Sequence, residues 1–421
     1  ARDAMDLSYI DEGLVEEKAS FLSALAVELE KTDFFTYQKT SGFDLFRKNL
    51  GLYFKNYFRI DLSEENFVIT PSQLVTCRNI ISLYKPKHIF IDKQLASNYF
   101  TDCEELIEIP QGSDLLCEMI VRLKPDLVIY SMPEVEARSS DALLRIIEVS
   151  AQSKTRVFID ISDFFELSSS PPQNGIFRYL ENHKLPAHIS LICGLVKNKI
   201  YTDLQVCIVI SSNAVFLEHL INAAELTYSR TPFLSQFYYS CILNDLLSFQ
   251  VMDEARKRQR LEPSLHLVED SEFIKIAEST KNAFLNPAII GEQQAQASKN
   301  LVRLDYGENC LPAPPEMKQL LFEAFTHQTI PVEDCDPKEE IIKLMSSLWS
   351  LPSTGNIQCI LSGGVAPIFS EIAQHCARNK ERILFPHGAY GYFVASAEFH
   401  GATVEKINTD EKRGFKIKAA H

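Results

Sequence analysis

The sequence has 421 residues, of which 46% are hydrophobic and 23% are charged, and this composition is typical of a folded protein of two or three domains. It carries 42 lysines and arginines against 56 aspartates and glutamates, and the net charge of −14 disfavours binding to nucleic acid or to an anionic membrane. No apolar run approaches the roughly 18 residues that span a bilayer. The ten cysteines include no C-x-x-C pair, which suits a reducing compartment. We therefore expect a soluble, cytoplasmic protein without nucleic-acid, membrane or metal partners.

Short apolar runs alternate with longer amphipathic stretches over the first half of the chain, a pattern typical of buried strands joined by crossover helices. The expected strands are Phe67–Thr70, His88–Ile91, Asp126–Tyr130, Val157–Asp160, Ile189–Ile192 and Gln205–Ile210. The expected helices between them include Gln73–Leu83, Ser113–Leu123 and Ser139–Gln152. The sequence predicts an α/β domain built on a doubly wound, mostly parallel sheet.

The second half of the chain indicates a change of organisation. Helical periodicity continues from Asn213 to Phe249, after which the sequence becomes polar and aperiodic. Further on, a strand at Asn356–Ser362, a helix and a strand at Arg382–Phe385 repeat the order of elements seen near the start of the first domain. We expect a first unit at residues 1–250, a connector at residues 251–300, and the opening part of a second, similar unit at residues 301–421.

Several common catalytic and nucleotide-binding motifs are missing from the sequence. It has no G-x-G-x-x-G, no P-loop, no H-E-x-x-H and no G-x-S-x-G. With only 15 glycines, it also lacks the glycine-rich loop with which a Rossmann-type methyltransferase holds S-adenosylmethionine. Dinucleotide-binding and P-loop functions are therefore excluded.

Several segments of the first unit resemble the fold-type I pyridoxal-phosphate enzymes, the group of aspartate aminotransferase. The similar segments are Ser41–Lys48, Glu65–Gln73, Val157–Asp160, Gly194–Lys197 and Gln205–Ile208. The resemblance implies a sheet of the aminotransferase large-domain kind. It also implies that Lys197 stands at the Schiff-base position, Asp160 at the position facing the pyridine nitrogen, and Ser72 in the phosphate-binding turn.

The second unit resembles other parts of the same cofactor site. Gly363 and Gly364 lie in a turn similar to the phosphate cradle, and Tyr390 lies in a loop similar to the one that carries the stacking aromatic residue. For both glycines a tight strand-to-helix turn is the other interpretation, and for Tyr390 it is a place in the core. Neither unit contains a complete set of cofactor residues.

Other residues that the family uses for its cofactor are replaced in this sequence. Gln205 stands in place of the phosphate arginine, Gly194 in place of a serine, and Glu134 and Glu136 follow the strand where the family has an asparagine-proline motif. We interpret the two glutamates as solvated side chains on a loop. Losing the guanidinium removes the best partner of the phosphate, so we interpret Lys197 and Asp160 as relics and expect no cofactor in this chain.

A closer resemblance is to the carboxy-terminal, aminotransferase-like region of plant methionine S-methyltransferases. It is carried by Phe158–Ser162, Cys193–Asn198 and Ser235–Tyr239, and it runs from about Asp11 to Ile417. The resemblance implies a parent protein of the cytosol that transfers a methyl group from S-adenosylmethionine to methionine, giving S-methylmethionine. It also implies that an amino-terminal methyltransferase domain binds S-adenosylmethionine and is a partner of this region.

Three hypotheses for the function of the chain follow. The first is a non-catalytic region for oligomerisation or regulation of the methyltransferase, present as a homo-oligomer. The alternative is an active pyridoxal-phosphate-dependent aminotransferase or lyase that uses Lys197 and Asp160. The third is a sensor that holds an amino acid or S-adenosylmethionine without chemistry.

Overall fold

The structure is a computed structural model, and it describes residues 20–27, 38–92, 106–109, 112–169, 171, 174–195, 204–261, 314–327, 337–349, 358–386 and 391–409. The chain divides into two compact units. Unit one comprises Ala1–Ala224 with Arg230–Pro312, and unit two comprises Glu225–Ser229 with Ala313–His421.

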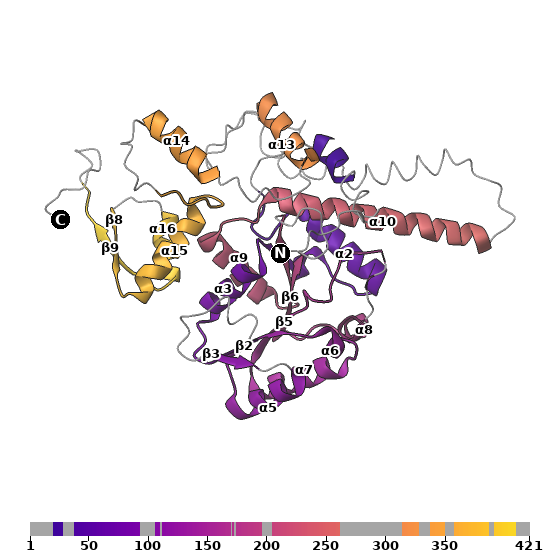
Figure 1. Ribbon diagram of the computed structural model, residues 1–421. Coiled ribbons are helices and arrows are strands. Elements are labelled where there is room, and N and C mark those ends of the chain that lie inside the picture. The colour runs from indigo at the N-terminus through magenta and orange to yellow at the C-terminus, as the bar shows by residue number, and fades with distance from the viewer. Residues whose placement is uncertain are drawn as a thin grey trace, which may run out of the picture. The chain divides into compact units, whose positions relative to one another are not determined.

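Unit one is built on a seven-stranded sheet (Figure 1). Its order is β1-β7-β6-β5-β4-β2-β3, in which β7 runs antiparallel to both of its neighbours and all other pairs are parallel. The strands are β1 (Phe67–Thr70), β2 (Ile89–Asp92), β3 (Leu106–Ile109), β4 (Leu127–Ser131), β5 (Arg156–Asp160), β6 (Ile189–Leu195) and β7 (Val206–Ile210). The predicted fold class, α/β with a mostly parallel sheet, is confirmed.

Three helices of unit one, α3, α5 and α7, agree closely with the expected segments, and the others were not predicted with these bounds. They are α2 (Asp44–Phe58), α3 (Gln73–Tyr84), α5 (Ser113–Leu123), α6 (Glu134–Ala137), α7 (Asp141–Ser153), α8 (Gly175–Asn182), α9 (Ala214–Thr227, whose last turn belongs to unit two) and α10 (Phe233–Leu261), with a short 3-10 helix η1 (Glu64–Asn66) before β1. The stretch expected to be helical over residues 213–249 is interrupted before Phe233, where Pro232 lacks the N–H that a continuous helix needs. Helix α10 ends at Leu261, so the first residues of the expected connector are helical. The rest of the connector lies outside the described residues, and the expected boundaries stay a prediction.

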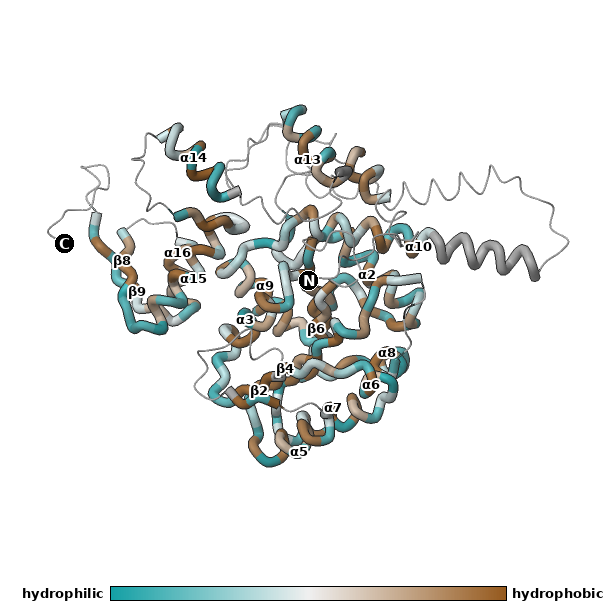
Figure 2. Tube along the Cα trace, viewed as in Figure 1, coloured by the Kyte–Doolittle hydropathy of each residue, from teal (hydrophilic) through white to brown (hydrophobic). Residues whose placement is uncertain are grey.

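The sheet is buried on both faces, as its continuous apolar strands predict. On one face, Cys77 and Ile80 of α3 and Phe216 and Leu220 of α9 pack with alternate residues of the strands. On the other face, Phe54 of α2 lies 5.8 Å from the ring of Phe67 in β1. Figure 2 shows hydrophobic residues along the strands and a mixture of hydrophobic and hydrophilic residues along the surrounding helices.

Unit two contains α13 (Pro315–His327), α14 (Pro337–Trp349), α15 (Val365–Arg378), β8 (Arg382–Pro386), α16 (Gly391–Phe399) and β9 (Thr403–Ile407). Strands β8 and β9 pair in parallel, and Ala373, Phe385, Ala397 and Ala402 form a small core with them. The expected strand at 356–362 is wrong for residues 358–362, which adopt no strand. The reason is pairing: among the described strands of unit two, β8 and β9 pair only with each other, whereas the corresponding β1 of unit one pairs with β7.

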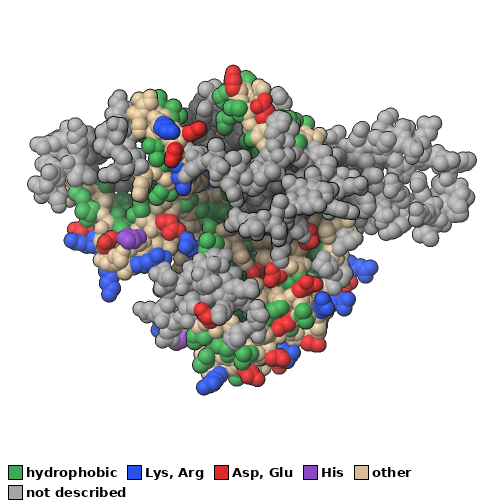
Figure 3. Space-filling view, viewed as in Figure 1, with side chains coloured by type: hydrophobic (Ala, Val, Ile, Leu, Met, Phe, Trp, Pro, Cys, Tyr) green, Lys and Arg blue, Asp and Glu red, His purple; other side chains and the backbone are tan. Residues whose placement is uncertain are grey.

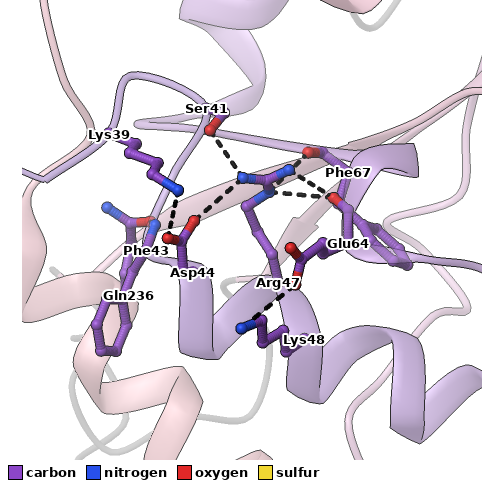
Figure 4. Close-up of polar contacts among 9 residues, drawn as sticks. All are labelled: Lys39, Ser41, Phe43, Asp44, Arg47, Lys48, Glu64, Phe67 and Gln236. Atoms are coloured by element: carbon purple, nitrogen blue, oxygen red, sulfur yellow. Dashed lines mark hydrogen bonds and ion pairs between the residues drawn. The ribbon is translucent and has the colours of Figure 1, made fainter. Parts of the chain in front are cut away.

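A buried arginine joins helix α2 to the beginning of the sheet in unit one (Figure 4). The Arg47 side chain donates from Nη2 to the Glu64 carbonyl at 2.7 Å, from Nε to the Phe67 carbonyl at 3.1 Å, and from Nη1 to the Ser41 hydroxyl at 2.8 Å. Burial lowers the pKa of Arg47, and the carboxylates of Asp44 and Glu64 oppose that shift. One guanidinium therefore satisfies backbone carbonyls at the point where the chain enters β1.

The same entry segment contains a glycine that no other residue could replace without strain. Gly42 has φ of +115°, and a Cβ built there would lie 2.6 Å from a side-chain carbon of Ile69. The backbone N–H of the next residue, Phe43, donates to Oε1 of Gln236 in α10 at 2.7 Å. Close packing against β1 and α10 fixes how α2 begins.

We predict that Arg47→Ala lowers the free energy of unfolding of unit one by about 3 kcal/mol, because a buried and a half-buried backbone carbonyl lose a charged donor. Lys48→Ala is the matched control: its ion pair with Glu64 is 3.8 Å long and the two side chains are 45% and 39% exposed, so we expect a change within about 0.5 kcal/mol. Far-UV circular dichroism during urea denaturation is the measurement, since the single tryptophan, Trp349, lies in unit two. Equal losses for the two variants would contradict the anchoring role of Arg47.

Candidate functional site

The carboxyl ends of the parallel strands meet at one edge of the sheet of unit one, the usual position of ligand sites in α/β proteins. Asp160 is the last residue of β5, and Ser131 is its partner at the end of β4. Ser72 and Gln73 follow β1, which leads to the same edge, and Gly194 lies near the end of β6. The fold thus brings the predicted residues Asp160 and Ser72 to one edge.

Asp160 is 5% exposed, and its carboxylate accepts four hydrogen bonds from its own chain. Oδ1 accepts from the backbone N–H of Ser162 at 3.0 Å and from the Ser162 hydroxyl at 2.5 Å. Oδ2 accepts from the Ser131 hydroxyl at 3.1 Å and from Nε2 of Gln73. An ionised carboxylate offers about four lone-pair positions, so its acceptor capacity is used.

The Ser162 hydroxyl extends this network to the next strand. While it donates to Asp160, its oxygen accepts the backbone N–H of Gly194 in β6 at 2.7 Å. A Cβ added at Gly194 would lie 3.4 Å from the Ser162 oxygen and 3.8 Å from Cβ of Gln73. Residue 194 therefore lies against the donors that cover Asp160.

Burial raises the pKa of Asp160, and the hydrogen bonds from Ser162 and Ser131 oppose that shift. The nearby Asp163 carboxylate raises it further. Two buried thiols, Cys207 and Cys77, are close enough to Asp160 to interact with it electrostatically. Burial raises the pKa of Cys207 to about 12 and raises that of Cys77 well above its usual value. These thiols are inert at neutral pH, so they supply no nucleophile.

Ser72 is the N-cap of helix α3. Its hydroxyl accepts the backbone N–H of Val75 at 3.3 Å, and its carbonyl accepts the Thr76 hydroxyl at 2.8 Å. The adjacent Gln73, predicted as the first residue of a helix but not as a site residue, is the residue whose side chain reaches Asp160. The signal that could have identified it is its place in the first helical turn, directly after a strand that ends at the same edge as β5.

The other predicted site residues are not joined to this network by the structure. Lys197 and Tyr390 lie outside the described residues. Gly363 and Gly364 belong to unit two and are exposed in the turn before α15, where Gly364 has φ of +104° and requires glycine. Of the predicted cofactor set, the structure thus places Asp160 and Ser72 at this edge and the two glycines in a turn of unit two, and the cofactor-binding role of all of them stays a prediction.

The interpretation of Glu136 as a solvated loop residue is wrong. Glu136 lies in the short helix α6, and its carboxylate accepts the backbone N–H of Ser113 at 3.0 Å and the hydroxyl of Tyr130 at 2.7 Å. Gly112, the N-cap of α5, has no side chain with which to cap that helix. Glu136 supplies the missing acceptor, and its charge suits the positive end of the helix.

The fit of this edge to pyridoxal phosphate can be judged at Asp160. A pyridine ring nitrogen needs a free acceptor position on this carboxylate. All four positions accept donors from the chain itself. In this arrangement the residues do not fit the ring of the cofactor.

Neither a metal site nor a membrane-spanning helix is present among the described residues. No group of three or more histidine, cysteine, aspartate or glutamate side chains in that part of the chain is placed to hold a metal ion. Within the same ranges, no helix has both the length and the apolar character needed to cross a membrane. On the face drawn in Figure 3, the described lysine and arginine side chains are interspersed with aspartate and glutamate.

We predict that Asp160→Ala lowers the free energy of unfolding by about 1–3 kcal/mol, because three side chains lose their acceptor. Asp160→Asn keeps one acceptor oxygen without the buried charge, so at pH 7 it should lose less stability than Asp160→Ala. Because the folded protein binds the Asp160 proton more tightly than the unfolded chain, this residue stabilises the fold most below about pH 4 and loses that contribution as pH rises through its folded pKa. The stability of Asp160→Asn relative to wild type should therefore rise with pH, as measured by denaturation at several pH values. A relative fall with pH would contradict the inferred direction of the pKa shift.

We predict that Glu136→Ala costs about 1 kcal/mol of stability and speeds hydrogen exchange in the first turn of α5, since the Ser113 amide loses its acceptor. Glu134→Ala is the matched control on the same helix. The Glu134 carboxylate is exposed and forms only a 3.9 Å ion pair with exposed Arg138, so its removal should change stability by less than about 0.5 kcal/mol. Exchange in α5 that is unaltered by Glu136→Ala would show that this carboxylate is not the cap.

Comparisons with known proteins agree with the sequence resemblance. The chain is 31% identical over 433 residues to methionine S-methyltransferase of Arabidopsis thaliana, covering 99% of this chain and 40% of that protein. It is also 31% identical over 434 residues to methionine S-methyltransferase of Zea mays, covering 98% and 39%. No family model matches the chain.

Among solved structures, the fold aligns with aminotransferases. One is a methionine aminotransferase from Escherichia coli, with a TM-score of 0.45, 11% identity, and coverage of 57% of this chain and 67% of that one. Another is aspartate aminotransferase from Thermotoga maritima, with a TM-score of 0.41, 15% identity, and coverage of 60% and 70%.

The chain spans about two fifths of the length of the curated relatives it matches. The predicted resemblance to methionine S-methyltransferases is confirmed by similarity along almost the whole of this sequence. The chain is therefore a homologue of a segment that makes up about 40% of plant methionine S-methyltransferases.

Proposed function

We propose that this chain is a non-catalytic, aminotransferase-like region of a methionine S-methyltransferase, a protein that transfers a methyl group from S-adenosylmethionine to methionine and gives S-methylmethionine. Similarity over 99% of the chain to proteins of that name supports the assignment. Because the chain spans about 40% of those relatives, the activity of the whole protein is part of the proposal.

The observation that carries the non-catalytic part of the proposal is the occupied acceptor capacity of Asp160. Gln73, Ser131 and Ser162 donate four hydrogen bonds to its two oxygens. A carboxylate that faces the pyridine nitrogen holds the ring protonated so that the ring can accept electrons. Asp160 instead serves to join β5 to β4, β6 and α3, and this role is structural.

The proposed division of work places the methyl transfer elsewhere in the parent protein. This sequence has no glycine-rich loop for S-adenosylmethionine, so the donor would be bound by the amino-terminal methyltransferase domain, which we propose as the partner of this region. The region would act through oligomerisation or regulation. The resemblance to fold-type I enzymes supports a homo-oligomer, and isolated cysteines in the sequence support a cytoplasmic location.

The test is whether the purified chain takes up pyridoxal phosphate. We expect a colourless protein as purified, and after addition of the cofactor and reduction with borohydride we expect peptide mapping to find Lys197 labelled no faster than surface lysines. The reason is that neither the ring nor the phosphate would find its partners. Lys197→Ala is the control, and its absorbance spectrum should match that of the wild type.

A stable yellow adduct that survives dialysis and disappears in Lys197→Ala would contradict the non-catalytic proposal. It would favour instead the alternative function, an aminotransferase or lyase that uses Lys197 and Asp160.

A further inference from the structure

The four donors to Asp160 differ in how the fold holds them. Ser162 lies two residues after Asp160, and Ser131 is its register partner on the neighbouring strand, so both are placed by the sheet itself. Gln73 lies 87 residues away in the sequence and reaches the carboxylate with a long side chain from the first turn of α3. Gln73 is therefore the donor that one side-chain change can remove without altering the sheet.

The burial of these residues shows what the carboxamide does. Asp160 is buried, whereas Gln73, Ser131, Ser162 and Gly194 are partly exposed. The donors therefore form a polar cover between the carboxylate and solvent. Next to Gln73 in this cover, Gly194 contributes no side chain.

We propose that the Gln73 carboxamide takes the position on Asp160 that the ring nitrogen of a heteroaromatic cation, such as a protonated pyridine, would otherwise occupy, and that Gln73 is the residue that closes this site. The inference rests on the proposed non-catalytic function and extends it by naming the residue that prevents binding. Nε2 of Gln73 is an N–H donor directed at Oδ2, as a pyridinium N–H would be. A neutral side chain thus satisfies a carboxylate that could otherwise pair with a cation.

Removing the carboxamide should create a binding site rather than a simple void. Oδ2 would keep only the Ser131 hydroxyl as its donor. A buried carboxylate with an unused acceptor position favours a cationic donor, because burial disfavours an unpaired charge. The space left by the Gln73 side chain would adjoin Gly194, where no side chain intrudes.

The experiment compares the wild-type chain with Gln73→Ala, using pyridoxamine as the probe. Pyridoxamine has the pyridine ring but neither the phosphate nor the aldehyde, so its binding does not depend on Lys197 or on a phosphate site. We expect Gln73→Ala to bind the probe at least about tenfold more tightly than the wild type in calorimetry, the effect of one charge-assisted hydrogen bond. The gain should disappear in the double variant Gln73→Ala with Asp160→Asn.

Gln205→Ala is the matched control. Gln205 is an exposed glutamine next to β7, at the same edge of the sheet, so its removal should leave pyridoxamine binding at the wild-type level. A folded Gln73→Ala protein that gains no affinity would overturn the inference, and so would a gain that persists with Asp160→Asn.

A measurement on the wild type keeps the inference testable if Gln73→Ala does not fold. In a protein with 15N-labelled glutamine side chains, the Gln73 amide should exchange with solvent at least about tenfold more slowly than the amide of exposed Gln205, and it should shift in Asp160→Asn. Exchange as fast as that of Gln205 would overturn the inference.

The two proposals fail in different ways. A stable pyridoxal-phosphate adduct on the wild type would overturn the non-catalytic function. A wild type without an adduct, together with a Gln73→Ala variant that gains no pyridoxamine affinity, would overturn only the role of Gln73.

Discussion

The structure of unit one depends on satisfying one buried carboxylate at the carboxyl edge of its sheet. A buried negative charge without hydrogen bonds is costly, so Asp160 constrains every element that lies around it. Strand β4 supplies a hydroxyl, the segment after β5 supplies a hydroxyl and an N–H, and α3 supplies a carboxamide. Through the Ser162 hydroxyl the same network fixes Gly194 in β6.

This constraint explains how a residue of catalytic type can remain in a chain for which we propose no catalysis. A buried aspartate at a strand end needs its acceptor positions filled, and either a cofactor or side chains of the chain itself can fill them. The donors from Gln73, Ser131 and Ser162 fill them within the chain. At the beginning of β1, the Arg47 side chain satisfies the Glu64 and Phe67 carbonyls in the same way.

Some elements could not be predicted from local patterns. Strand β3 was missed because it is four residues long, contains Glu108, and pairs only with β2 at the edge of the sheet. Residues 358–362 have strand-like composition but no strand partner among the described residues of unit two. The role of Glu136 was hidden because the helix that it caps begins 23 residues earlier in the sequence.

The sequence by itself determined the fold class, most strand and helix bounds, and the similarity to methionine S-methyltransferases, because continuous apolar strands and amphipathic helices leave periodic patterns and the quoted motifs are specific. It also determined that Asp160 ends a strand at the edge where sites form. Only the tertiary structure decided what that aspartate contacts. Hydrogen-bond partners such as Gln73 and Asp160 lie 87 residues apart and are brought together by sheet order and helix placement, which no local pattern encodes.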